Sequence, residues 1–128
     1  MTIMNTARRL LATAGLAVTL LSMSAAHADE AMMNAEIDHL LETVAGSDCV
    51  FIRNGDEHDA AAARDHLQMK RERGRRYYDS TEQFIERIAS RSSWSGKDYH
   101  IRCGAEPEQA ARDWFTAVLE KYRSTAAQ

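Results

Sequence analysis

The stretches Cys49-Val50-Phe51-Ile52-Arg53-Asn54-Gly55 and Tyr99-His100-Ile101-Arg102-Cys103 decide the predicted fold. The first is short, β-branched and aromatic and stops at Asn54-Gly55, so we predict a strand over 49–53 that ends in a turn. The second alternates in polarity, as a half-buried strand does. One antiparallel register places Cys49 opposite Cys103, Phe51 opposite Ile101 and Arg53 opposite Tyr99, with the two apolar residues on one face.

Helical patterns surround both strands. We predict helices over 31–45, over 57–73, from the capping box Ser80-Thr81-Glu82-Gln83 onward, and from a first turn containing Pro107 to Tyr122. Asp56 is expected to cap the second helix, and Gly46 to end the first in a left-handed conformation. The order predicts an α+β fold, with about four helices packed on a two-stranded antiparallel sheet in a single small domain.

Residues 1–28 have the pattern of a cleavable export signal. Arg8 and Arg9 precede an apolar run over 10–21, and 26–28 offer small residues for cleavage near Ala28. The run is shorter than the ~20 residues that a membrane span needs, so we expect no stable span after cleavage. We predict a signal peptide over 1–28, one domain over 29–128 and a periplasmic location. The paired arginines leave the general and the twin-arginine export routes open.

Removal of this signal makes the net charge of the remaining chain more negative. The chain has 16 basic and 19 acidic residues, and the signal holds two arginines and no acid, so the remainder carries a formal charge of −5. Nucleic-acid-binding domains are normally basic, so this balance argues against that class. Leu, Ile, Val and Phe make up 15 of the remaining 100 residues, a low content that predicts disorder unless periodic apolar faces and an extra constraint compensate.

The cysteine pair supplies such a constraint. The chain has two cysteines, and an exported chain meets an oxidising compartment, so we predict a Cys49–Cys103 disulfide. The alternatives are a reduced buried pair and a metal site, and two cysteines so far apart are weak evidence for a metal.

Two blocks of residues form a specific combination over about half of the predicted mature domain. The first is Phe51-Ile52-Arg53-Asn54-Gly55 with Ala63, His66-Leu67 and Lys70; the second is Thr81-Glu82-Gln83-Phe84-Ile85 with Ile88-Ala89-Ser90, Ser92-Ser93, Ser95-Gly96, Tyr99 and Ile101. In these blocks the chain resembles the YfeK-like family of small exported bacterial proteins of unknown function. The resemblance implies a periplasmic location and an α+β domain, and it brings no reaction or catalytic residue. The cysteines lie outside the blocks.

Polar residues are expected to gather at one end of the strand pair, which we call the rim. The first strand ends where the second begins, and the serine-rich loop 90–97 enters there. The rim comprises Arg53, Asn54, Gly55, Ser92, Ser93, Trp94, Ser95, Gly96 and Lys97. Its donor groups suit a carboxylate, a phosphate or a glycan, and Trp94 offers a stacking surface. Alternatively, these residues only form turns and caps, and Trp94 covers the third helix.

Two further features of the second helix are secondary candidates. His66 and Lys70 share a helix face and form an acid/base or ligand-contacting pair, or else a half-buried imidazole beside a solvated lysine. The run 70–76 has five positive charges and one negative and precedes Tyr77 and Tyr78. This run either contacts an anionic polymer or lipid headgroups, or it is a solvated helix end whose cations complement the helix dipole. His58 and His66 have no metal-binding spacing, so we predict no metal.

Catalytic templates are missing from the sequence. It contains no Gly-x-Ser-x-Gly, Ser-x-x-Lys, His-Glu-x-x-His or phosphate-loop motif, and Glu82 and Glu86 are either paired carboxylates or a solvated helix face. We therefore predict a monomeric, cofactor-free, non-enzymatic periplasmic domain that binds an envelope component or a protein partner through the rim. The alternative is a small cell-wall hydrolase that uses His66 with a rim serine or carboxylate. A third class is a structural or inhibitory module with a flat apolar patch.

Overall fold

The computed structural model describes residues 17–128, and side chains from residue 25 onward. The arginines and most of the apolar run of the predicted export signal lie outside these residues. Within the described range the elements are α1 (Ala17–Ala45), β1 (Cys49–Arg53), β2 (Asp56–His58), α2 (Ala60–Arg73), the 3-10 turn η1 (Arg75–Tyr77), α3 (Thr81–Phe84), the π-helical turn η2 (Ile85–Ala89), β3 (His100–Cys103), β4 (Gln109–Ala110) and α4 (Ala111–Ala126).

The central strands pair in the predicted register. β1 and β3 are antiparallel, with Cys49 opposite Cys103 and Phe51 opposite Ile101. The cysteines form a disulfide, which excludes the reduced pair and the cysteine metal site. Phe51 and Ile101 are buried on the face toward the helices. Arg53 and Tyr99 lie just beyond the paired residues, at the same end of the two strands.

The prediction of a two-stranded sheet was wrong, because the described chain forms a four-stranded sheet in the order β2-β1-β3-β4. Asn54 and Gly55 have φ values of 51° and 83° and connect Arg53 directly to its partner Asp56. A two-residue turn with both φ values positive closes a β-hairpin. Asp56 therefore begins β2 instead of capping a helix, and Asp59 caps α2 by accepting a 2.8 Å hydrogen bond from the Ala62 N–H.

Two other local predictions also need correction. Pro107 precedes β4 and lies outside α4, whose first N–H, that of Ala111, donates to the carbonyl oxygen of Tyr99. Gly46 follows α1 without a positive φ. The third helix begins as predicted, with Ser80 Oγ accepting from the Gln83 N–H. It then widens into η2, which leaves Ile85, Ile88 and Ala89 buried.

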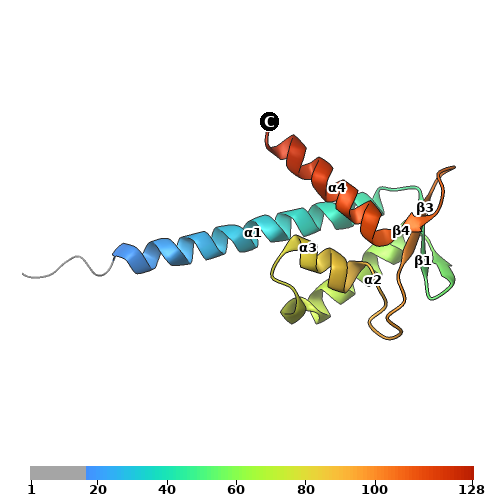
Figure 1. Ribbon diagram of the computed structural model, residues 1–128, viewed down its shortest axis with the longest axis horizontal. Helices are drawn as coiled ribbons and strands as arrows, with labels where there is room; N and C mark the ends of the chain where they lie inside the picture. Colours follow the sequence, from blue (N-terminus) through green and yellow to red (C-terminus); the bar gives the residue numbers. More distant parts are fainter. Residues whose placement is uncertain (1–16) are drawn as a thin grey trace, which may run out of the picture.

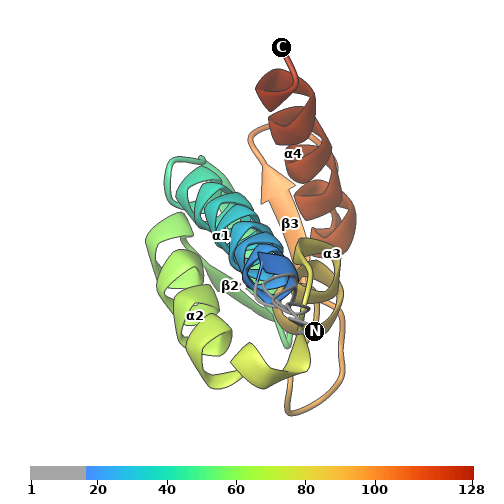
Figure 2. The same ribbon diagram turned by 90° about the vertical axis from the view of Figure 1, so that its left-hand side faces the viewer.

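The helices pack on one side of the sheet (Figures 1 and 2). α1 lies between α2 and α4 and buries the predicted stripe of Met33, Ile37, Leu40, Leu41 and Val44. Glu36 is buried on the same helix, and Arg123 of α4 holds its carboxylate through a 2.8 Å Nε–Oε2 contact. Arg123 also pairs with Glu82 of α3, so one guanidinium joins three helices.

The N-terminal part of α1 extends beyond the rest of the fold (Figure 1). Its described side chains are exposed up to Met32, and Met33 is the first buried one. Helix 31–45 was therefore predicted with the right core face but too late a start. Among the described residues, no helix combines the length and apolar character needed to cross a membrane.

Replacement of both cysteines by alanine should destabilise the domain. The disulfide joins residues 54 positions apart, and closure of such a loop contributes ~4 kcal/mol in the chain-entropy model. We expect a lower urea midpoint for Cys49→Ala/Cys103→Ala, and a reductant should lower the midpoint of the native chain but not that of the variant. Equal midpoints for the two proteins would contradict this role.

Gly74→Ala should also destabilise the fold, by ~1–3 kcal/mol, because overpacking forces neighbouring atoms to move. A Cβ at Gly74 would lie 2.6 Å from Ile88 Cδ1 and 2.9 Å from the carbonyl oxygen of Lys70. Gly46→Ala is the matched control, since its Cβ would lie 3.4 Å from the nearest atom. Thermal unfolding of the two variants should separate them, and similar melting temperatures would count against the crowding at Gly74.

Candidate anion-binding groove

An open groove of about 1050 Å³ lies beside the turn of the β1–β2 hairpin. One side is formed by α2 and η1, and the other by η2 and the loop that leads to β3. Its lining residues are Arg53, Asn54, His66, Met69, Lys70, Arg73, Gly74, Arg76, Tyr77, Asp79, Glu86, Arg87, Ile88, Arg91, Ser92, Ser93, Trp94 and Tyr99. The groove therefore joins the two sequence blocks that carried the family resemblance.

Positive charge dominates this groove. Six cations line it: Arg53, Lys70, Arg73, Arg76, Arg87 and Arg91. The lining contains two carboxylates, Asp79 and Glu86. Among the residues the structure describes, only Arg91 of these six reaches a carboxylate, that of Glu86 at 4.0 Å. The groove thus has four more cations than carboxylates, and five of its cations make no ion pair in the described chain.

Most arginines outside the groove are paired with carboxylates, and among the described residues Arg112 is the exception. Those with carboxylate partners are Arg64, Arg71, Arg75, Arg102 and Arg123. The unpaired charge is therefore concentrated at the groove and is not a general property of this acidic chain.

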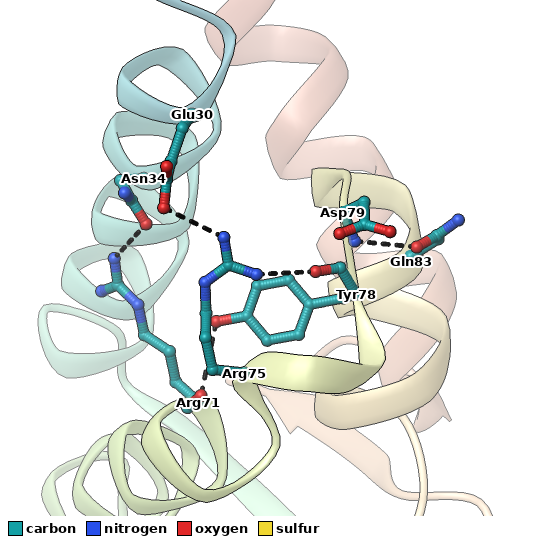
Figure 3. Close-up of polar contacts among 7 residues, drawn as sticks. All are labelled: Glu30, Asn34, Arg71, Arg75, Tyr78, Asp79 and Gln83. Atoms are coloured by element: carbon teal, nitrogen blue, oxygen red, sulfur yellow. Dashed lines mark hydrogen bonds and ion pairs between the residues drawn. The ribbon is translucent and has the colours of Figure 1, made fainter. Parts of the chain in front are cut away.

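The basic run 70–76 divides between two sides of α2 and η1. Arg71 donates to Asp38 at 2.6 Å and to Asn34 at 3.2 Å, both on α1. Arg75 donates to Glu30 at 3.1 Å, and Figure 3 shows both arginines reaching toward α1. Three other cations of the run, Lys70, Arg73 and Arg76, line the groove. The run is thus both an anchor for α1 and one wall of the groove.

The two tyrosines after the run also lie on different sides, one in the core and one in the groove. Tyr78 is buried against Phe84 with ring centroids 5.3 Å apart, and its carbonyl oxygen accepts from Arg75. Tyr77 is exposed in the groove and carries the guanidinium of Arg76 over its ring, 4.8 Å from the centroid.

Lys70 and His66 meet Tyr99 at the floor of the groove. Lys70 is buried, and its Nζ donates to the carbonyl oxygen of Arg91 at 2.6 Å and to the Tyr99 hydroxyl at 3.2 Å. The same hydroxyl lies 3.3 Å from His66 Nε2. We call Arg53, His66, Lys70 and Tyr99 the floor cluster. The alternative of a solvated Lys70 was wrong, because the side chain is buried, and Tyr99 lies between it and His66. The ligand-contacting pair stays a prediction.

Burial disfavours the charged form of His66, Lys70 and Tyr99, and nearby positive charge further disfavours protonation of His66 and Lys70. The pKa of His66 falls to about 4, first because of desolvation and then because of the charges of Arg53, Lys70 and His58. The pKa of Lys70 falls to about 8 through desolvation and Arg53. Burial raises the pKa of Tyr99. At neutral pH the imidazole is therefore neutral, and Arg53 and Lys70 supply the local charge.

The rim residues tie the loop to the hairpin turn. Asn54 Nδ2 donates to Ser92 Oγ at 3.4 Å, and Ser95 Oγ donates to Asn54 Oδ1 at 2.6 Å. Ser92 Oγ also accepts from the N–H groups of Trp94 and Ser95. Ser92 and Ser95 thus have the structural role given as the alternative. The Trp94 side chain is 90% exposed, so it does not cover the third helix.

The structure gathers part of the predicted rim in the groove. The members that line it are Arg53, Asn54, Ser92, Ser93 and Trp94. The members outside the lining are Gly55, Ser95, Gly96 and Lys97, all of them exposed.

Among the cationic and hydroxyl-bearing residues of the lining, sequence reasoning missed Arg87, Arg91 and Tyr99. Arg87 lies in η2 and Arg91 lies beyond its last residue, Ala89, so no shared helix face in the sequence marks this pair. Tyr99 was predicted only as the partner of Arg53 in the sheet. That pairing already placed its hydroxyl-bearing side chain at the correct end of the strands.

No hydrolytic arrangement is found among the described residues. His66 does face the groove that Ser92 and Ser93 line, but its ring hydrogen bond is to Tyr99, not to a serine or a carboxylate. Glu82 pairs with Arg123, whereas Glu86 lines the groove. In the same part of the chain, no group of three or more histidine, cysteine, aspartate or glutamate side chains is placed to hold a metal ion.

These features define a small disulfide-bonded α+β domain with a basic groove. The chain belongs to a family described as "Family of unknown function (DUF5329)", whose model matches residues 31–123. It is 41% identical over 71 residues to "Uncharacterized protein YfeK" of Salmonella typhimurium strain LT2, an alignment that covers 56% of this chain. The matched part spans 57% of that relative. The YfeK-like resemblance is thereby confirmed, and no solved structure matches the chain.

The depressed pKa of His66 should make stability pH-dependent. As the pH falls from 6.5 to about 4, the unfolded chain binds a proton at this residue while the folded chain does not, so folding stability is lost over that interval. His66→Gln should lose less stability between pH 7 and pH 4.5, by on the order of 1 kcal/mol because solvent screens the half-exposed ring. Urea unfolding at both pH values measures this difference, and identical losses in both proteins would contradict it.

Proposed function

We propose that the protein is an exported, non-enzymatic binding domain whose groove takes an anionic glycan of the cell envelope. The observation that carries this proposal is the set of five groove cations without an ion pair among the described residues. Like charges gathered in a groove repel one another and focus a positive potential toward solvent. A bound carboxylate or phosphate would relieve that repulsion.

Exposed aromatic rings favour a glycan over a simple ion. Trp94 and Tyr77 both line the groove, with side chains 90% and 52% exposed. Large amphipathic rings of this kind commonly anchor partners, because they offer an apolar face together with a polar edge. A sugar ring could stack on these faces while its acidic groups contact the arginines. An acidic protein surface is the other class of ligand that the binding experiment below would reveal.

Export is supported by the sequence and is compatible with the structure. The predicted signal ends near Ala28, and the described residues that precede Met33 contribute nothing to the core. Cleavage there would keep Glu30, the partner of Arg75. The Cys49–Cys103 disulfide suits an oxidising compartment such as the periplasm.

The decisive experiment titrates the exported protein with two kinds of anionic envelope glycan. Muropeptides present carboxylates, and delipidated lipopolysaccharide core presents phosphates. Isothermal titration calorimetry at low salt should detect binding of at least one of them. Arg53→Gln/Arg73→Gln should weaken it by about tenfold or more, since each lost charged hydrogen bond costs ~1.5–3 kcal/mol.

Arg112→Gln/Lys121→Gln is the matched control. It removes the same charge from exposed α4 residues that lie outside the groove and form no ion pair in the described chain. Its affinity should stay within about twofold of the native value, because distant charges are screened. Equal weakening in both double variants, or no binding of either glycan, would refute the proposal.

A further inference from the structure

The floor cluster is more specific than a general positive surface. Its groups come from separate parts of the fold: Arg53 ends β1, His66 and Lys70 lie on α2, and Tyr99 precedes β3. Lys70 Nζ, the Tyr99 hydroxyl and His66 Nε2 form a continuous series with successive separations of 3.2 and 3.3 Å. These groups open into the groove, whereas the apolar core lies behind them.

We propose that the floor cluster binds one phosphate monoester group of the ligand. This inference rests on the proposed function and names the acidic group that the groove recognises. Lys70 Nζ has three N–H bonds, of which two are directed to Arg91 and Tyr99, so one remains for a ligand oxygen. Arg53 adds a guanidinium without an ion pair in the described part of the chain.

The arrangement favours a phosphate over a carboxylate. A carboxylate presents two oxygens in one plane and is matched best by a single bidentate guanidinium. The floor instead offers an ammonium, a phenol, an imidazole and a guanidinium from different directions. A phosphate monoester presents three acceptor oxygens and ~1.5–2 negative charges near neutral pH, so it can contact several of these donors at once.

Phosphate binding at this place should be coupled to proton uptake. The charged or titratable groups that surround or line the groove near His66 come from β1, β2, α2, η2 and the residues flanking β3: Arg53, His58, Lys70, Glu86, Arg91 and Tyr99. The cations among them lower the pKa of His66, and a phosphate dianion would oppose their effect. His66 would then take up a proton on Nε2 and donate it to the Tyr99 hydroxyl, which leaves the O–H of Tyr99 free to donate to the ligand.

The test titrates the full exported protein with inorganic phosphate, and with acetate at matched ionic strength, while NMR follows the His66 imidazole. The change in the His66 signal should saturate with phosphate, and bound phosphate should raise the pKa of His66 from about 4 toward its ordinary 6.5, whereas acetate should leave this pKa unchanged.

Arg53→Gln and Lys70→Met should each weaken phosphate binding by about tenfold. Arg112→Gln should not. Arg53 is only partly buried, so its variant keeps the test valid even if Lys70→Met fails to fold. An equal effect of phosphate and acetate on His66, or phosphate binding unaffected by Arg53→Gln, would overturn the inference.

The outcomes also separate this inference from the proposed function. If muropeptides bind through Arg53 and Arg73 but phosphate does not perturb His66, the phosphate site is refuted and the glycan-binding groove stands. If neither glycan nor phosphate binds, both proposals fail. If phosphate binds at the floor but neither glycan binds, the phosphate site stands and the envelope glycan is the wrong ligand.

Discussion

The covalent link between Cys49 and Cys103 within the β1–β3 ladder is the constraint on which the rest of the structure depends. It fixes the pairing of strands that are 54 residues apart at the two cysteines, and the register then buries Phe51 and Ile101 together. A shift of one residue would turn these side chains toward the opposite face. The same register brings Arg53 and Tyr99 to one end of the sheet, where the groove begins.

The groove is built from residues that also hold the fold together. On α2 and η1, Arg71 and Arg75 reach α1, while Arg73 and Arg76 face the groove. Lys70 joins both roles, because its Nζ fixes the carbonyl of Arg91 while remaining at the floor. The groove cations are therefore carried by elements that are already held in place by packing and hydrogen bonds, which limits the conformational entropy lost when a ligand binds.

Local patterns predicted the helical core faces, the central strand register and the disulfide. They did not predict the two outer strands, β2 and β4, because the sequence around each is compatible with more than one local structure. Asn54-Gly55 predicts a turn, and in the structure this turn closes a hairpin to β2, the structure for which this dipeptide is a strong signal. β4 consists of two residues, too short for any periodicity. The groove combines Arg53, Lys70 and Arg87 from three distant segments, so its charge excess depends on tertiary packing that no single motif reveals.

The salt dependence of glycan affinity tests the central claim most directly. If unpaired groove cations hold an anionic ligand, the association constant should fall steeply and linearly with salt on logarithmic axes, because bound counterions are displaced. We predict this behaviour for the native protein and a shallower slope for Arg53→Gln/Arg73→Gln. An affinity that does not change with salt, or the same slope for both proteins, would contradict the account.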